Sequence, residues 1–392
     1  MLGVTDKLRG SELATSGADP GRPRSSRHIE QLDGLRGIAI IMVMLFHMKA
    51  APPIGPFAVA WAKLCRHGGL GVDVFFVLSG FLITGILLDT LRRPHYFRNF
   101  YGRRALRILP LYYAVLCFAF VVLPRIAPWS VEKYASVNAD AIWYWLHLSN
   151  FSIARRGAFV HGIVDVSWSL AIEEQFYLLW PAIVLRFSSR GLRSLCLGLM
   201  AVSVASRIWL TAAQVSPVAI YTLTFCRFDG LAMGALTALV VRGRDASEIR
   251  TLLRRGLCAI CPLCLLFAVP LDTTFGRALK AGNSYFLVSS CTACAILAIL
   301  SVPKSFMIRP LEWSALRAFG RYSYALYLFH NTIAGVLRDF VLRPSRMPLV
   351  FGSSFPSQFF FYLAAGGASL GAAALSWHLY EERFLRLKRF FV

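Results

Sequence analysis

The sequence predicts an all-α fold, a polytopic transmembrane helix bundle of about ten spans with both termini in the cytoplasm. The first observation is composition: 57% of the 392 residues are hydrophobic and 16% are charged, and the mean hydropathy is +0.57. A soluble chain of this length would need more polar surface to cover itself. The second observation is a series of apolar runs near the length of about 20 residues that a helix needs to cross a bilayer.

The third observation is the position of the basic residues between these runs. Lys and Arg gather in the segments that face the cytoplasm if the N-terminus lies inside, which favours both termini inside. The net charge of +22 is therefore a topology signal rather than a nucleic-acid-binding surface. The expected spans are 35–50, 68–89, 108–127, 167–186, 194–213, 218–241, 257–271, 282–302, 322–341 and 358–379.

Two regions follow from this division. Residues 1–28 are polar and rich in Gly, Ser, Pro and Arg, which predicts a disordered cytoplasmic tail, and residues 29–392 form one transmembrane domain. The first apolar run begins late and lacks a small-residue cleavage site, so we expect no removable signal peptide. The nine cysteines lie mostly in apolar segments, so we expect neither a disulfide framework nor a metal site.

Ionisable side chains within the spans are the clearest functional signal. Each costs about 2.5–3.5 kcal/mol at the bilayer centre, so several together imply a polar cavity. Arg36 and His47 lie almost three helical turns apart in the first span, which places them on one face, about 16 Å apart along the axis. Arg103, Arg104 and Arg107 lie at the expected cytoplasmic end of the third span.

The acidic residues are expected further toward the outside. Asp73 enters the second span from that side, and Glu173 and Glu174 enter the fourth. Arginine clusters bind phosphates through planar, bidentate donors, whereas a histidine beside a carboxylate is the usual general base. A phosphate-bearing donor that enters from the cytoplasm and meets a base at its far end describes a transferase.

Each of these residues also has a structural explanation. The arginines of the third span are equally explained as positive-inside anchors, Arg36 as the cap of its span and His47 as an interfacial side chain. Arg227 and Asp229 in the sixth span fit a structural ion pair, and His330 fits a hydrogen bond to a neighbouring helix.

Six stretches of the sequence resemble the acyltransferase 3 family of membrane enzymes. They occur in the family's order and extend from the first expected span to the ninth, so the resemblance covers nearly the whole chain. The stretches are LDGLRGIAIIMVMLFH, GVDVFFVLSGFLIT, FRNFYGRRALRILPLYY, WSLAIEEQFYLLWP, RFDGLAMG and GRYSYALYLFH.

The resemblance implies a bundle of about ten helices that moves an acyl group, usually acetyl, from cytoplasmic acyl-CoA to a hydroxyl of a glycan, glycolipid or other acceptor. The family's Arg-x10-His motif falls on Arg36 and His47, and its Arg-x-x-Arg motif falls on Arg104 and Arg107. Some members carry a further extracytoplasmic hydrolase-like domain, which we expect to be absent here. We expect an integral protein of the bacterial inner membrane in contact with lipid, with no permanently bound cofactor.

On this hypothesis His47 is the general base, and Glu173, Glu174 or Asp73 orients it or stabilises its protonated form. The four arginines named above hold the CoA phosphates. A covalent acyl-histidine intermediate is an open variant of this mechanism. The alternative class is a transporter or flippase of a glycan or glycolipid, because buried ionisable groups also mark substrate pathways.

Overall fold

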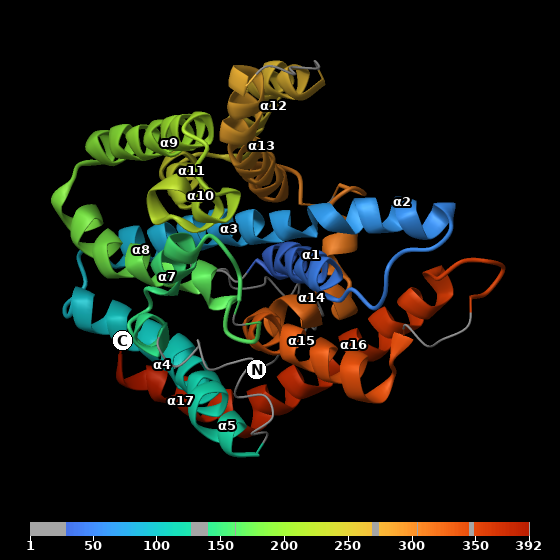
Figure 1. The fold of residues 1–392 in the computed structure, drawn as a ribbon. Helices are drawn as coiled ribbons and strands as arrows, with labels where there is room; N and C mark the ends of the chain where they lie inside the picture. Colours follow the sequence, from blue (N-terminus) through green and yellow to red (C-terminus); the bar gives the residue numbers. More distant parts are fainter. Residues whose placement is uncertain are drawn as a thin grey trace, which may run out of the picture.

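The fold is known from a computed structural model that describes residues 29–126, 140–160, 162–268, 274–303, 305–344 and 349–391. The predicted tail at 1–28 lies outside the described residues. Within them the chain forms helices joined by short turns, and its extended structure is limited to an isolated bridge between Val350 and Ser353 (Figure 1). The all-α prediction is therefore confirmed.

The helices follow one another closely along the chain. Several continue as π-helical or 3₁₀ turns, as α4 does through Phe118–Val122 into α5. The α-helices are α1 Glu30–His47, α2 Pro56–Cys65, α3 Gly71–Thr90, α4 Tyr96–Cys117, α5 Leu123–Ile126, α7 Ser149–Arg156, α8 Ser167–Arg186, α9 Ser189–Ala212, α10 Pro217–Thr222, α11 Phe228–Val241, α12 Ala246–Ala268, α13 Thr274–Ser301, α14 Ser314–Arg321, α15 Ser323–Val336, α16 Phe355–Ser376 and α17 Glu382–Arg386.

Five helical segments of the described chain are long and apolar enough to cross a membrane. The expected count of ten spans is not reached by this criterion, since helices such as α1 and α8 carry several ionisable side chains along their length. The orientation of the termini stays a prediction. The five segments are Pro56–Thr90, Tyr96–Arg125, Ser189–Ala212, Ala278–Ser301 and Phe355–Phe390.

The expected sixth span at 218–241 is not one continuous helix. It is divided into α10 and α11 by a 3₁₀ turn at Thr224–Cys226. A break in a helix frees backbone carbonyls from the i→i−4 pattern, and the freed carbonyl of Cys226 accepts a hydrogen bond from the buried Arg207 of α9. The break thus provides an acceptor for an arginine that has no access to water.

Helix α3 lies at the centre of the bundle and packs against α1, α8, α11 and α13. Its contact with α11 is close because glycines meet backbone there: a Cβ at Gly80 would lie 2.0 Å from the carbonyl oxygen of Leu231, and one at Gly234 would lie 2.0 Å from that of Val77. Helices α12 and α13 pack on each other and project from the rest of the bundle (Figure 1).

Candidate active site

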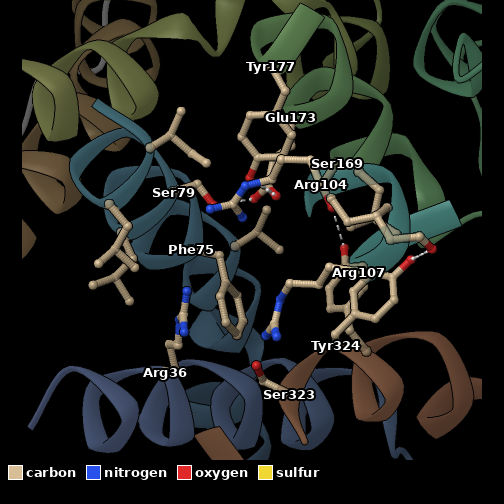
Figure 2. Close-up of a pocket in the computed structure, with 17 residues that line it drawn as sticks. Arg36, Phe75, Ser79, Arg104, Arg107, Ser169, Glu173, Tyr177, Ser323 and Tyr324 are labelled. Carbon is tan, nitrogen blue, oxygen red and sulfur yellow. Dashed lines mark hydrogen bonds between the residues drawn. The ribbon is translucent and has the colours of Figure 1, made fainter. Parts of the chain in front are cut away.

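A cavity of about 100 Å³ lies where α1, α3, α4, α8 and α15 meet. Arg36 of α1 and Arg104 and Arg107 of α4 line it, and Figure 2 shows their guanidinium groups around Phe75. Glu173 of α8 is the acidic residue among the lining side chains. Three permanent positive charges against one carboxyl group make this cavity suited to an anion.

The arginines of the cavity leave much of their donor capacity free for a ligand. Among the described residues the ion-pair contact of Arg36 is a long one, 3.7 Å from its Nη1 to Oδ1 of Asp33 on the same helix. Arg104 lies over the ring of Tyr177, with its Cζ 5.7 Å from the ring centroid. Each guanidinium carries five N–H donors, so a phosphate entering the cavity would find several within reach.

Glu173 is fixed on the wall of this arginine cavity. The hydroxyl of Tyr177 donates to its Oε2 at 2.8 Å, and the hydroxyl of Ser79 donates to its Oε1 at 3.1 Å (Figure 2). The structure therefore places this carboxyl group with the arginines, which differs from the expectation that it orients His47. Both oxygens are already engaged by donors on α8 and α3.

His47, the last residue of α1, lies against His330 of α15. Nε2 of His330 is 3.2 Å from Nδ1 of His47, and the two ring centroids are 5.0 Å apart. Nδ1 of His47 also lies 3.0 Å from the carbonyl oxygen of Val43, and Nδ1 of His330 lies 2.9 Å from that of Leu326. His330 thus hydrogen-bonds a neighbouring helix, and the residue it meets there is His47.

These contacts favour one tautomer for each of the two neutral rings. A carbonyl oxygen only accepts hydrogen bonds, so the contacts with Val43 and Leu326 favour the tautomer with the proton on Nδ1 in each neutral ring. In this tautomer Nε2 of His330 holds a lone pair, and the single Nδ1–H of His47 is shared between that lone pair and the carbonyl oxygen of Val43. The unprotonated nitrogen of His47 is then Nε2. Its lone pair is not used by His330, so Nε2 is the atom able to take a proton from a substrate.

Helix α15 connects the arginine cavity to the histidine pair. Ser323 and Tyr327 line the cavity, and His330 continues the same stripe of the helix three residues later. The Tyr327 and His330 ring centroids are 6.0 Å apart. The hydroxyl of Tyr327 is 2.7 Å from that of Ser169, which also lines the cavity. Residues of α15 thus link the cavity that contains Arg36 with His47 at the other end of α1.

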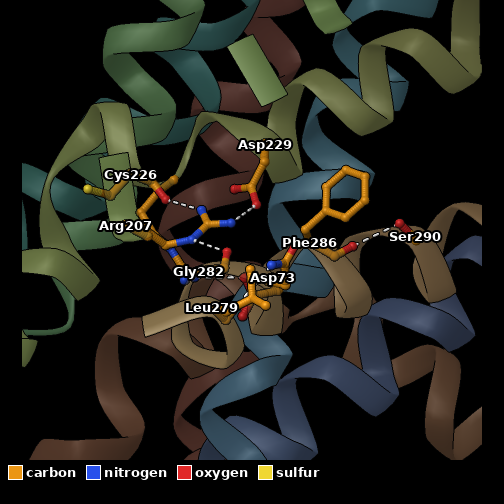
Figure 3. A network of polar contacts seen from close by, with 10 residues as sticks. Asp73, Arg207, Cys226, Asp229, Leu279, Gly282, Phe286 and Ser290 are labelled. Atoms are coloured by element: carbon orange, nitrogen blue, oxygen red, sulfur yellow. Dashed lines mark hydrogen bonds and ion pairs between the residues drawn. The ribbon is translucent and has the colours of Figure 1, made fainter. Parts of the chain in front are cut away.

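A separate polar network lies on the other side of α3. Asp73 forms a buried ion pair with Arg227, 2.8 Å between Oδ1 and Nη2, and Asp229 forms one with Arg207 at 2.7 Å. Arg207 also donates to the carbonyl oxygens of Cys226 and Gly282 (Figure 3). The guanidinium of Arg227 lies among aromatic rings, with that of Tyr285 closest at 3.9 Å.

The position of Asp73 corrects the expectation that it serves His47. One residue along a helix turns the side chain by 100°, so Asp73 points away from its neighbour Val72, which lines the cavity. Asp73 shares its stripe with Phe76 and Gly80, which face Arg227 and α11. The predicted pair of Arg227 and Asp229 is not formed either, since Arg227 pairs with Asp73 and Asp229 pairs with Arg207.

The remaining two candidate residues do not line the cavity either. Glu174 is half-buried on α8, one step round the helix from Glu173. Arg103 is exposed on α4, and its Nε donates to the carbonyl oxygen of Phe391 near the C-terminus. Of the four arginines expected to bind the donor, three therefore come together and Arg103 serves a contact between helix ends.

Sequence reasoning missed the residues that link these parts of the site. Tyr177 and Ser79 hold Glu173, and Tyr327 lines the cavity and lies next to His330. The spacing of Tyr327 and His330, three apart in YSYALYLFH, was the available signal because such pairs share a helix face. The described residues contain no group of three His, Cys, Asp or Glu side chains placed to hold a metal ion.

Comparison with known proteins identifies the family. The family model described as "Acyltransferase domain", of the acyltransferase 3 type, matches residues 29–378. No solved structure matches the chain.

Three bacterial relatives show how far the similarity extends. The peptidoglycan O-acetyltransferase OatA of Listeria monocytogenes is 28% identical over 79% of this chain and 50% of its own length. The putative peptidoglycan O-acetyltransferase YrhL of Bacillus subtilis is 32% identical over 78% and 49%, and the O-acetyltransferase OatA of Staphylococcus aureus is 29% identical over 79% and 51%. The chain spans about half the length of these relatives.

The relatives and the apolar helices agree on the kind of protein. Five described segments are able to cross a membrane, and an integral protein of the bacterial inner membrane is consistent with both observations. The family match covers most of the chain. The chain therefore belongs to the acyltransferase 3 family.

Proposed function

We propose that the protein is a membrane O-acyltransferase that moves an acyl group, acetyl in the first instance, from acyl-CoA to a hydroxyl of a glycan or glycolipid. The observation that carries this proposal is the convergence of Arg36, Arg104 and Arg107 on one cavity, whose wall residue Tyr327 lies beside His330 of the histidine pair. The names of the relatives support a glycan acceptor and acetyl as the group transferred.

The donor would approach from the end of α1 that carries Arg36. The cavity of about 100 Å³ is small beside the roughly 300–1,000 Å³ of sites that enclose a drug-sized ligand. It suits a thin acyl-pantetheine arm, while the phosphates bind the arginines at its mouth and the nucleotide stays outside. The distribution of Lys and Arg between the apolar runs supports a cytoplasmic position for this end, where acyl-CoA is made.

The acceptor would react at the other end, beside His47. Its hydroxyl loses a proton to Nε2 of His47 as the oxygen attacks the thioester carbonyl carbon. The tetrahedral intermediate then expels the CoA thiolate by breaking the C–S bond, and the thiolate takes the proton from the imidazolium. His330 keeps the ring of His47 oriented by accepting from its Nδ1–H, the role that a carboxylate has in many acyl-transfer enzymes.

Reconstituted protein tests this assignment. In proteoliposomes supplied with isotopically labelled acetyl-CoA and soluble peptidoglycan fragments, the wild type should add one acetyl group, detected by mass spectrometry. Removing a general base lowers the rate by about 10²–10⁴-fold, so His47→Ala should fall by that factor while the protein stays folded in the membrane. Undiminished transfer by His47→Ala would reject the role of His47.

The same vesicles separate the enzyme from a transporter. A flippase would move a labelled glycolipid across the bilayer without acyl-CoA. The proposed enzyme would leave the glycolipid unmodified in the absence of acyl-CoA and acylate it once acyl-CoA is added. Translocation that is independent of acyl-CoA, with no acylated product, would replace the proposal with the transport function.

A further inference from the structure

A second cavity, of about 370 Å³, lies at the His47 end of α1. It is bounded by α2, by α16 and by residues 49–53, the segment that leaves α1. Lys49 belongs to its lining and lies two residues after His47, so the Cα atoms of these residues are at most about 7 Å apart. Nothing in the proposed donor path uses this cavity.

Gln358 of α16 fixes the wall of this cavity relative to His47. Its Nε2 donates to the carbonyl oxygen of Met48 at 2.9 Å, and its Oε1 accepts from the backbone N–H of Ala50 at 2.9 Å. Both polar atoms of the side-chain amide are thereby engaged by the backbone that follows His47. A ligand bound in the cavity would therefore sit at a defined position relative to the base.

The lining combines aromatic faces with hydrogen-bonding groups. Trp61 of α2 and Phe355 and Tyr362 of α16 contribute rings, and the Trp61 and Phe355 centroids are 5.8 Å apart. The indole N–H of Trp61 is buried and interacts with the side chain of Tyr362, so these two rings form one wall of the cavity. Aromatic rings on the wall of a cavity of this size suit the faces of a sugar ring.

The charge of the lining adds a preference. Arg338 is neutralised by its neighbour Asp339, with Nε to Oδ1 at 2.7 Å and Nη2 to Oδ2 at 3.1 Å. Lys49 has no carboxylate within ion-pair distance in the described part of the chain, and its ammonium lies 5.0 Å from the ring centroid of Phe46. One exposed, uncompensated ammonium at the edge of a sugar-like cavity favours an acidic ligand.

We propose that this cavity is the acceptor site and that it takes an acidic saccharide. The pyranose ring would lie against Trp61 and Tyr362, its carboxylate would bind Lys49, and one hydroxyl would be directed to Nε2 of His47. The inference rests on the proposed acyl transfer for its role in catalysis, whereas binding of the saccharide itself does not depend on that reaction.

Two probes and two sets of variants test the site in reconstituted full-length protein. The probes are the disaccharide N-acetylglucosaminyl-N-acetylmuramic acid and the methyl ester of its carboxyl group. Lys49→Gln should raise the KM and Kd of the acid about tenfold, leave those of the ester unchanged and be rescued by Lys49→Arg. Trp61→Ala should raise both constants for both probes about tenfold, and Trp61→Phe should have a smaller effect because it keeps a ring.

The matched control is Trp209→Ala, since Trp209 is 69% exposed on α9 away from the cavity. It should change neither constant, and the KM for acetyl-CoA should be the same in all variants. Equal loss with acid and ester in Lys49→Gln would overturn the acidic preference. Unchanged constants in both Lys49→Gln and Trp61→Ala would overturn the site.

Measuring binding beside transfer keeps the two proposals distinguishable. If the wild type binds the acid and the variants do not, but no acetyl group moves, the site stands and the proposed enzymatic function fails. If acetyl transfer proceeds with an acceptor KM that none of the variants changes, the function stands and the site fails. Absence of both binding and transfer with the wild type would overturn both.

Discussion

Nε2 of His330 lies 3.2 Å from Nδ1 of His47, so the proposed base is oriented by a second imidazole. A neutral partner stabilises an imidazolium less than a carboxylate does, and its main effect is to hold the ring and fix its tautomer. His330 is therefore a positioning residue, and its contribution should appear in the rate of transfer rather than in the binding of either substrate.

Substitution of His330 tests this directly. His330→Leu removes the acceptor at Nε2 and should lower kcat by about 10–100-fold with little change in either KM, whereas His330→Gln keeps a carbonyl oxygen near that position and should retain more activity. Steady-state kinetics with acetyl-CoA and a soluble glycan would measure the difference. Equal loss in both variants would contradict a role through this hydrogen bond.

The arginine cavity predicts a difference between neighbouring residues of α4. A charge-assisted hydrogen bond contributes about 1.5–3 kcal/mol, so Arg104→Ala and Arg107→Ala should each raise the KM for acetyl-CoA by about 10–100-fold. Arg103→Ala is the matched control because Arg103 bonds the carbonyl of Phe391 outside the cavity. A similar increase in the control would mean that the charge of the helix end, and not the cavity, attracts the donor.

The buried pair of Asp73 and Arg227 predicts an effect on stability. Removing one partner leaves an uncompensated charge, so Asp73→Leu or Arg227→Met alone should lower the free energy of unfolding by about 3–5 kcal/mol. The double variant should lose less than either single one, since no charge is then left unpaired. Thermal unfolding in detergent would rank the stabilities of the two single variants and the double variant. If the losses of stability in the single variants add up to that of the double variant, the two residues do not act as a pair.

Two glycines of α3 provide a further matched test. Ala at Gly80 would place its Cβ 2.0 Å from a backbone oxygen of α11 and should destabilise the fold by about 1–3 kcal/mol, as overpacking does. At Gly85 a Cβ meets no described atom within 4 Å, so Gly85→Ala should be neutral or slightly stabilising. Equal melting temperatures for the two variants would contradict the close approach of α3 and α11.

The sequence predicted the helical class and the arginines of the cavity correctly. It did not predict which side chains the acidic residues and His47 contact. Composition and apolar run length suffice for the class, and helical spacing indicated that Arg104 and Arg107 share a face. The rotation of each helix about its own axis is set by tertiary packing. Adjacent positions on α3 face different neighbours because each residue is turned by 100°. Asp73 therefore faces Arg227 and not His47.

The histidine pair shows a second limit of sequence reasoning. His47 and His330 are 283 positions apart, and each looked like an isolated polar residue in its own span. Only the packing of α15 against α1 makes them partners. Depth alone grouped His47 with carboxylates, because hydropathy reports how far along a span a residue lies and is silent on which helix it faces.

The stripe of α15 that carries Ser323, Tyr327 and His330 constrains how this protein is able to diverge. A substitution that turned α15 about its axis would alter the arginine cavity and the orientation of His47 together, so the donor end and the base are inherited as one unit. The walls of the second cavity come mainly from α2, α16 and residues 49–53, which carry none of these residues. We therefore expect related proteins that use different acceptors to differ on α2, on α16 and in the segment equivalent to residues 49–53, while keeping α15 unchanged.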